Sequence, residues 1–263
     1  MRKHVRFSLN HNAWPTTPDS SPLARYGVVE GEWVYETDSL WDTAGKEGYA
    51  LSEVRLLPPV CPTKIVCVGR NYVDHAKELG NPVPVEPLIF YKPPSSLIAS
   101  GDNIVYPSFV GQMSFEGELT LVMGRQARNV AAEDWEQYVY GYTIVNDITA
   151  RDLQKKDGQW ARAKGCDTFC PCGPFIVPRT ALHFDDIRIR SWVNGQPKQD
   201  GSVRDMIFSP GAIIAYVTQF LTLEPGDIIA TGTPPGVGPL EPGDSVKVAI
   251  EGIGALENKV IRG

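Results

Sequence analysis

Three carboxylates, Glu116, Glu118 and Asp147, are the residues whose types and spacing most directly suggest chemistry. The glutamates form a Glu-x-Glu pair inside an apolar stretch, and Asp147 ends a second apolar run. Residues two apart in a strand point to the same face, so we expect both glutamates on one face while Leu119 and Leu121 enter a core. The separation of Glu118 and Asp147 fits a strand–helix–strand return that brings the strand ends together.

Like charges gathered in a half-buried place are unfavourable unless a cation joins them. Mg²⁺ prefers carboxylate oxygens and keeps coordination positions open for water or substrate. The pattern therefore predicts a divalent-metal site. The alternative is a pair of exposed strand carboxylates plus a capping aspartate.

A second candidate group combines one imidazole with basic side chains. His75 and Glu78 are three apart on a predicted short helix, so they share a face. A carboxylate beside an imidazole fixes its tautomer and supports its protonated form, as a general base requires. Lys164 and Lys92 lie in polar loops between apolar elements. They are candidates only because the acids and the imidazole accompany them. A surface His–Glu pair and solvated lysines are the alternatives.

The loop at residues 231–238, Thr-Gly-Thr-Pro-Pro-Gly-Val-Gly, follows a predicted strand. Its backbone amides could hold a carboxylate. The loop lacks the Gly-Lys-Ser/Thr ending of a phosphate loop, so we do not expect a nucleotide. The sequence also offers no Gly-x-Gly-x-x-Gly opening a helix and no Gly-x-Ser-x-Gly elbow, which disfavours dinucleotide binding and serine hydrolase chemistry.

The composition is that of an ordinary globular protein. The chain has 263 residues, 42% hydrophobic and 21% charged, with a net charge of −6. This balance argues against nucleic acid or an anionic membrane as the main partner. No stretch approaches the ~20 apolar residues of a membrane span, and the charged residues 1–7 precede no apolar segment, so we expect a cytoplasmic protein. Five cysteines do not suggest a disulfide framework.

Frequent glycine and proline favour many short strands, and a proline-rich link separates a small N-terminal domain, 1–58, from a main domain, 59–263. A hairpin is expected at 28–35, and strands are expected at 64–69, 88–91, 115–123, 142–147, 175–177, 187–193, 228–231 and 245–250. Helices are expected from 132 onward, at 150–156, at 209–221 with Ser209 as cap, and between a capping Asn71 and Gly80. The pattern predicts an α+β fold, rich in β-structure, around a closed or folded-over sheet.

Several ordered stretches together resemble the fumarylacetoacetate hydrolase family over about residues 60–260. They are residues 68–75, 87–93, 115–119, 146–154, 163–169 and 226–234. The resemblance implies a mixed β-roll behind a small N-terminal domain, usually as a homodimer. It implies Mg²⁺ or Mn²⁺ held by Glu116, Glu118 and Asp147.

The resemblance also implies roles for the other candidates. His75 and Glu78 would act as the general base on a lid, and Lys164 would polarise the substrate. Thr233 would contact a substrate carboxylate, and the further substrate-binding residues would be Arg70, Lys92 and Gly232.

Family substrates are 2-oxo acids or their enols, whose carboxylate and adjacent oxygen can chelate the metal. The cation stabilises the negative charge of a developing enolate. We therefore expect an enzyme acting on a 2-oxo or 2-hydroxydienoic dicarboxylic acid, foremost a 2-hydroxyhepta-2,4-diene-1,7-dioate isomerase of aromatic catabolism. Hydrolysis of an acylpyruvate such as fumarylpyruvate and oxaloacetate decarboxylation are alternatives. A non-catalytic Ca²⁺-binding β-module is a distant one.

Overall fold

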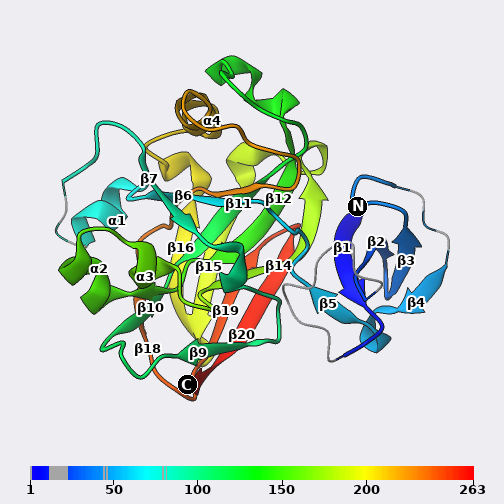
Figure 1. The fold of residues 1–263 in the computed structure, drawn as a ribbon, viewed down its shortest axis with the longest axis horizontal. Helices are drawn as coiled ribbons and strands as arrows, with labels where there is room; N and C mark the ends of the chain where they lie inside the picture. The colour runs from blue at the N-terminus through cyan, green and yellow to red at the C-terminus, as the bar shows by residue number, and fades with distance from the viewer. Residues whose placement is uncertain (1, 12–22, 44, 46, 79, 81) are drawn as a thin grey trace.

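The computed structural model describes residues 2–11, 23–43, 45, 47–78, 80 and 82–263, so residues 12–22 of the predicted N-terminal domain lie outside the described residues. The regular structure is mostly β-strand, and the helices are few and short (Figure 1). None of the described helices is long and apolar enough to cross a membrane. The α-helices are α1 (Val73–Glu78), α2 (Arg151–Asp157), α3 (Ala161–Lys164) and α4 (Pro210–Thr218). The 3₁₀ helices are η1 (Leu51–Glu53), η2 (Pro94–Ser96), η3 (Ala132–Gln137), η4 (Arg179–Ala181), η5 (Phe184–Asp186) and η6 (Val203–Asp205).

The largest sheet runs through both parts of the chain. Its strands, in spatial order, are β4 (Gly48–Ala50), β3 (Trp33–Thr37), β2 (Arg25–Glu30), β1 (Lys3–Ser8), β14 (Cys170–Pro178), β12 (Val139–Asn146), β11 (Gly117–Met123), β17 (Ile228–Ala230), β6 (Ile65–Gly69) and β7 (Leu88–Lys92). Off this path, β5 (Arg55–Leu57) pairs with β1 and β8 (Leu97–Ile98) pairs with β14. The sheet stays open, because β4 and β7 lie at opposite ends of this order, so of the two expected forms, closed or folded-over, the closed one is wrong.

Two smaller sheets complete the main domain. One has five strands in the order β16 (Gln196–Ser202), β15 (Arg188–Val193), β19 (Ser245–Ile250), β20 (Gly254–Arg262) and β9 (Asn103–Tyr106). The other has three, β13 (Thr149–Ala150), β10 (Met113–Phe115) and β18 (Gly238–Leu240). These mostly β elements confirm the predicted fold class.

The N-terminal strands dock onto the main domain as an extension of its sheet. His4 on β1 opposes Ile176 on β14, and its buried ring lies edge-on to Tyr140, whose Oη is 2.8 Å from His4 Nε2. Figure 1 shows this unit beside the main domain, with β1 and β5 on the side that faces it.

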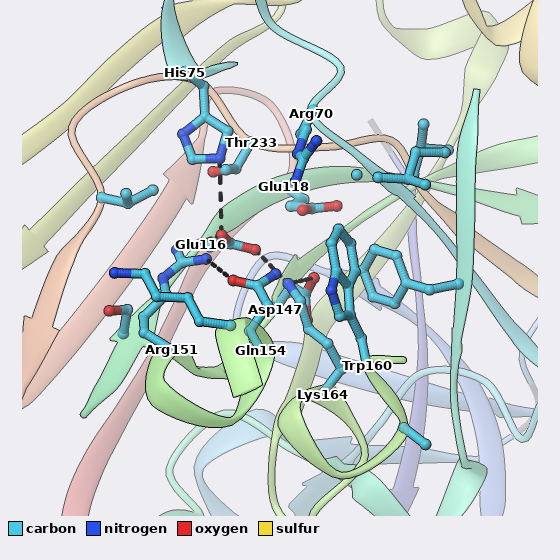
Figure 2. Close-up of a pocket in the computed structure, with 18 of the residues that line it drawn as sticks. Arg70, His75, Glu116, Glu118, Asp147, Arg151, Gln154, Trp160, Lys164 and Thr233 are labelled. Carbon is cyan, nitrogen blue, oxygen red and sulfur yellow. Dashed lines mark hydrogen bonds and ion pairs between the residues drawn. The ribbon is translucent and has the colours of Figure 1, made fainter. Parts of the chain in front are cut away.

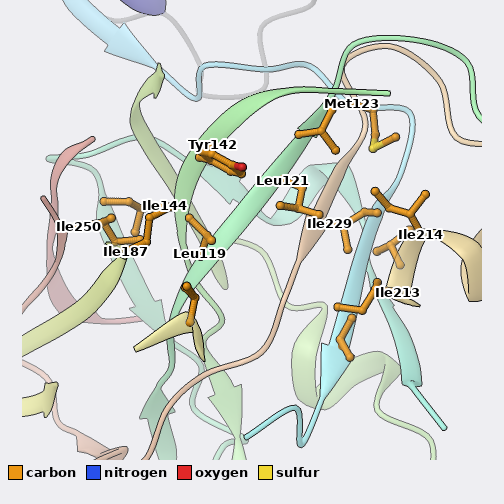
Figure 3. Close-up of a cluster of buried hydrophobic side chains, with 14 of the residues drawn as sticks. Leu119, Leu121, Met123, Tyr142, Ile144, Ile187, Ile213, Ile214, Ile229 and Ile250 are labelled. Atoms are coloured by element: carbon orange, nitrogen blue, oxygen red, sulfur yellow. The ribbon is translucent and has the colours of Figure 1, made fainter. Parts of the chain in front are cut away.

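The core of the main domain lies along β11. Leu119, Leu121 and Met123 are fully buried on one face, as the two-residue period predicts, and they pack against Ile213 and Ile229 (Figure 3). This burial pins β11 between β12 and β17. Residues of the opposite parity, including Glu118, are thereby turned to the other face.

Three local predictions need correction. The expected strand at 115–123 breaks at Glu116, because its N–H donates to Asn146 Oδ1 while β10 and β11 join different sheets. Asn71 does not use its side chain as a helix cap, since its amide bonds to Phe208 and Thr231 instead. The helix expected from residue 132 is the 3₁₀ helix η3. The Ser209 cap is confirmed, with Oγ accepting from Ala212 N.

Candidate active site

A cavity of about 1190 Å³ opens beside β11 and is lined by residues far apart in the sequence. Figure 2 shows charged side chains pointing toward one another across it. The lining includes Arg70, His75, Glu78, Glu116, Glu118, Asp147, Arg151, Gln154, Trp160, Lys164 and Thr233. The cavity therefore brings together most of the residues that the sequence singled out.

The β11–β12 ladder gathers the three carboxylates. Gly117 opposes Asn146, and Asp147 N donates to Glu116 O at 2.8 Å, so Asp147 lies directly across from Glu116. Each acid offers one oxygen, and these oxygens lie within 4.8 Å of one another. All three residues are buried, at 4%, 2% and 0% exposure for Glu116, Glu118 and Asp147, which rules out the exposed-carboxylate alternative.

Lys164 lies between two of these acids. Its Nζ is 2.6 Å from Glu116 Oε2 and 2.5 Å from Asp147 Oδ2. Burial alone lowers the pKa of Lys164, but the charges of Asp147 and Glu116 outweigh it and raise the pKa above its ordinary value. The lysine is therefore a fixed buried cation and not a solvated loop residue.

Arg151 is a site residue that sequence reasoning missed. Its guanidinium pairs with Glu116 Oε1 and donates to Gln154 Oε1 at 3.0 Å. Burial alone raises the pKa of Glu116, but the charges of Arg151, Lys164 and His75 hold it below its ordinary value. Arg151 opens α2, where the positive end of the helix dipole disfavours a cation. An arginine at this unfavourable position is a sequence signal that could have indicated an acidic partner elsewhere in the fold.

Glu118 differs from the other two acids in its partners. Its Oε2 accepts a hydrogen bond from Gly232 N at 2.9 Å, and no cation of the described residues lies within ion-pair distance of it. Burial, then the charges of Asp147 and Glu116, raises the pKa of Glu118 well above its ordinary value. Glu118 is thus a buried acid with no cationic partner among the described residues, and it lies close to two other acids. A divalent cation bound between the three would neutralise this excess of negative charge.

His75, on α1, lies above the carboxylates in the view of Figure 2 and is 3% exposed. Its Nδ1 is 3.3 Å from Glu78 Oε2, and its Nε2 is 3.8 Å from Glu116 Oε1. Glu78 also accepts from Gly236 N at 3.1 Å, which ties α1 to the loop after Thr233. The expected shared face of His75 and Glu78 is thus present, and one ring nitrogen faces the cavity.

Four residues expected to bind substrate occupy different places. Arg70 lines the cavity in a left-handed conformation, φ 56°, with its guanidinium 5.9 Å from the centre of the Trp160 ring. Such a conformation is uncommon for a non-glycine residue and typical of functional sites. Thr233 also lines the cavity, and its Oγ1 donates to Gly117 O at 2.8 Å. Gly232 instead orients Glu118 through its N–H.

Lys92 is buried behind the carboxylates and is not part of the described cavity lining. Its Nζ is 2.8 Å from Asp147 Oδ1 and donates to the carbonyls of Lys164, Ile148 and Phe169. This contact with Oδ1 is an ion pair and not a hydrogen bond of regular geometry. The structure therefore gives Lys92 a place as a support for Asp147 and Lys164, where it cannot reach a ligand in the cavity.

The donor set fits a divalent cation. Three carboxylate oxygens lie close enough to share one ion, and hard oxygen donors are the ligands of Mg²⁺ and Mn²⁺. Glu118 lacks a cation partner among the described residues and so has an oxygen to offer, whereas the two oxygens of Asp147 face Lys92 and Lys164. Glu116, Glu118 and Asp147 would hold the ion.

Family profiles match nearly the whole chain. Residues 64–261 match the profile described as fumarylacetoacetate (FAA) hydrolase C-terminal, and residues 3–59 match the one described as Rv2993c-like, N-terminal. The chain is 49% identical to Protein Rv2993c of Mycobacterium tuberculosis over 216 residues, which cover 81% of each chain. It is 41% identical to the oxaloacetate tautomerase YisK of Bacillus subtilis, over 87% of this chain and 79% of that protein.

Solved structures agree with this similarity. A 2-hydroxyhepta-2,4-diene-1,7-dioate isomerase from Mycobacterium marinum superposes with a TM-score of 0.86 and 39% identity, over 100% of this chain and 99% of that one. A fumarylpyruvate hydrolase from Pseudomonas aeruginosa, in complex with Mn²⁺ and pyruvate, gives 0.72 and 33%, over 78% of this chain and 91% of that one. The chain thus belongs to the fumarylacetoacetate hydrolase family of enzymes, through a C-terminal domain of that family preceded by an Rv2993c-like N-terminal domain.

Proposed function

We propose that this chain is a divalent-cation-dependent enzyme that moves a proton between the enol and keto forms of a short 2-oxo dicarboxylic acid. Oxaloacetate and 2-hydroxyhepta-2,4-diene-1,7-dioate are the substrates we favour. Two of the relatives carry the names of such enzymes, an oxaloacetate tautomerase and a 2-hydroxyhepta-2,4-diene-1,7-dioate isomerase. The observation that carries the proposal is a buried imidazole held beside three buried carboxylates.

His75 is the group that would transfer the proton. Glu78 holds Nδ1 at 3.3 Å, which leaves Nε2 directed toward the cavity and Glu116. In the conversion of enol to ketone, the hydroxyl oxygen loses a proton and a carbon conjugated with it gains one. Nε2 can deliver or accept that proton, and Glu78 supports the imidazolium form in between.

The carboxylate cluster supplies the second element. A divalent cation bound there would polarise the 2-oxo oxygen of the substrate and favour the negative charge that develops on it. Lys164 uses oxygens of Glu116 and Asp147 in this structure, so cation binding and these two ion pairs compete. If a divalent cation displaced the Lys164 ammonium from either carboxylate, that ammonium would have N–H donors available for a substrate oxygen.

The cavity wall is suited to an anionic substrate. Arg70, Arg151, Lys155 and Lys164 line it, and Gln112, Gln154 and Gln159 add neutral polar groups. Arginine can bind a carboxylate through two parallel hydrogen bonds. In the described structure Arg70 forms no ion pair with an acid. A substrate with a carboxylate at each end could bind a divalent cation held by the carboxylate cluster with one end and a cationic side chain on the wall with the other.

Hydrolysis of a carbon–carbon bond in an acylpyruvate is the second candidate. The His75–Glu78 pair favours it, because an oriented imidazole can also remove a proton from water. The Pseudomonas relative, named a fumarylpyruvate hydrolase, is a solved example with Mn²⁺ and pyruvate. Both candidates use the same side chains, and they differ in whether water attacks the substrate.

Substrate profiling with chelator-treated and Mn²⁺-loaded protein tests the proposal. The ultraviolet absorbance of the enol reports ketonisation of oxaloacetate and of the seven-carbon dienedioate. Absorbance loss from acetylpyruvate and fumarylpyruvate reports hydrolysis, and CO₂ release reports decarboxylation. We expect Mn²⁺-dependent acceleration of ketonisation with carbon recovered intact.

Hydrolysis products as the main outcome would favour the second candidate, and CO₂ as the main product would indicate a decarboxylase. Saturable cation binding without acceleration of any of these reactions would contradict an enzymatic role and favour the non-catalytic β-module.

A further inference from the structure

A buried glutamine outside the cavity connects two parts of the site. Gln199 lies on β16 of the five-stranded sheet, is 2% exposed, and is not among the residues that line the described cavity. Burying an amide costs free energy unless its hydrogen-bonding groups are satisfied. The partners of this side chain therefore show what it holds in place.

The carbonyl end of Gln199 binds the segment between two of the acids. Its Oε1 accepts from Gly117 N at 3.1 Å and from Ser191 Oγ at 3.0 Å. Gly117 is the residue between Glu116 and Glu118, so this contact fixes the peptide that separates them. A Cβ at Gly117 would meet Val248 Cγ1 at 2.8 Å and Gln199 Oε1 at 3.1 Å, which shows how closely the backbone is packed there.

The amide nitrogen of the Gln199 side chain binds the loop that carries Thr233. Its Nε2 donates to Thr233 Oγ1 and to Pro234 O, both at 2.7 Å. The orientation of the amide follows from these partners, because the Pro234 carbonyl can only accept and Gly117 N–H can only donate. Rotating the amide by half a turn would leave Pro234 O and Gly117 N facing like groups.

One further bond closes the connection. Thr233 Oγ1 accepts from Gln199 and donates to Gly117 O at 2.8 Å. The N–H and the carbonyl of Gly117 are thus both held, one by Gln199 directly and one through Thr233. All four hydrogen-bonding positions of the Gln199 amide are used.

We propose that Gln199 is a positioning residue that sets the spacing of Glu116 and Glu118 and their placement relative to Thr233. This inference rests on the proposed function only in taking the carboxylates as cation ligands. Groups that orient the ligands of a metal typically change metal affinity by about 10–100-fold when removed. Gln199 therefore contributes to cation affinity without touching the cation or the substrate.

The test compares Gln199→Met with Gln196→Met. Methionine keeps the unbranched shape and removes the hydrogen bonds, and Gln196 is an exposed glutamine on the same strand. Calorimetric titration of chelator-treated protein with Mn²⁺ alone measures affinity, and the electron paramagnetic resonance spectrum of bound Mn²⁺ reports ligand geometry. We expect Gln199→Met to weaken Mn²⁺ binding by about 10–100-fold and to alter the spectrum, while Gln196→Met matches the parent.

Parental affinity and an unchanged spectrum in a folded Gln199→Met protein would overturn the inference. If that variant does not fold, Ser191→Ala takes its place, since it removes one partner of Oε1. A smaller weakening in the same direction is then expected, and parental affinity would again refute the inference. A parent that binds Mn²⁺ but turns over none of the acids would refute the proposed function and leave the Gln199 comparison valid.

Discussion

Replacing Lys92 by methionine tests whether this lysine supports the carboxylate cluster. Lys92 is 1% exposed, with Nζ 2.8 Å from Asp147 Oδ1 and hydrogen bonds to the carbonyls of Ile148 at 3.1 Å and Phe169 at 2.8 Å, besides that of Lys164. Methionine fills similar volume but offers no donor. The change leaves buried acceptors unsatisfied and removes one cation from Asp147.

The size of the effect follows from these contacts. Removing one partner of a buried ion pair costs about 3–5 kcal/mol, and each buried carbonyl left without a donor costs about 1–3 kcal/mol. These costs are not additive, and Asp147 keeps Lys164, so we expect the free energy of unfolding to fall by about 4 kcal/mol. A loss of this size is a large share of the free energy of unfolding of a typical protein, which is roughly 5–15 kcal/mol.

Urea unfolding followed by tryptophan fluorescence, in the presence of chelator, measures this loss. Lys77→Met is the matched control, because Lys77 pairs with Asp74 at 3.4 Å on the exposed surface of α1. An exposed pair contributes less than about 1 kcal/mol. If Lys92→Met loses no more stability than Lys77→Met, the lysine does not hold buried charges together and our placement of it is wrong.

Two further predictions concern the cation and the base. Burial and the charge of Asp147 raise the pKa of Glu118, so the chelator-treated parent should lose stability as pH rises above the ordinary carboxyl range, through the raised pKa. Glu118→Gln should abolish that loss, so the variant should melt at a higher temperature than the parent in chelator. In Mn²⁺ at about 100 times the parental Kd, where the parent gains about 2.7 kcal/mol, the variant should melt at a lower temperature than the parent. If the same protein melts higher in chelator and in Mn²⁺, this prediction is contradicted. His75→Gln should lower turnover by about 10²–10⁴-fold and leave Mn²⁺ affinity unchanged, with Lys77→Met as the control for the same helix. Turnover at the parental rate would remove His75 from its proposed role.

The sequence predicted the parts of the site that depend on local patterns. The two-residue period of β11 predicted which side Glu118 and Leu119 would take, and both are buried on opposite faces of the strand. The i,i+3 spacing of His75 and Glu78 likewise predicted their contact. Such features follow from backbone geometry over a few residues, so they can be recognised in a single sequence.

The supporting contacts could not be predicted in the same way. Gln199 and Gln196 lie on one strand, and their neighbours do not show which of them is buried against Gly117. Lys92 follows an apolar run like many solvated lysines, and the carbonyls that it bonds lie 56 to 77 residues along the chain. Asn71 could have served locally as a helix cap, but its side chain instead donates hydrogen bonds to the distant Phe208 and Thr231. These contacts depend on how the sheets pack.

The central claim is that Glu116, Glu118 and Asp147 together bind one divalent cation. Calorimetric titration of chelator-treated protein with Mn²⁺, repeated in buffers of different ionisation enthalpy, tests it directly. We predict one cation per chain, release of a proton as Glu118 ionises, weaker binding as pH falls, and loss of binding in Asp147→Asn. Absence of saturable binding by the parent, or parental affinity in Asp147→Asn, would contradict the claim.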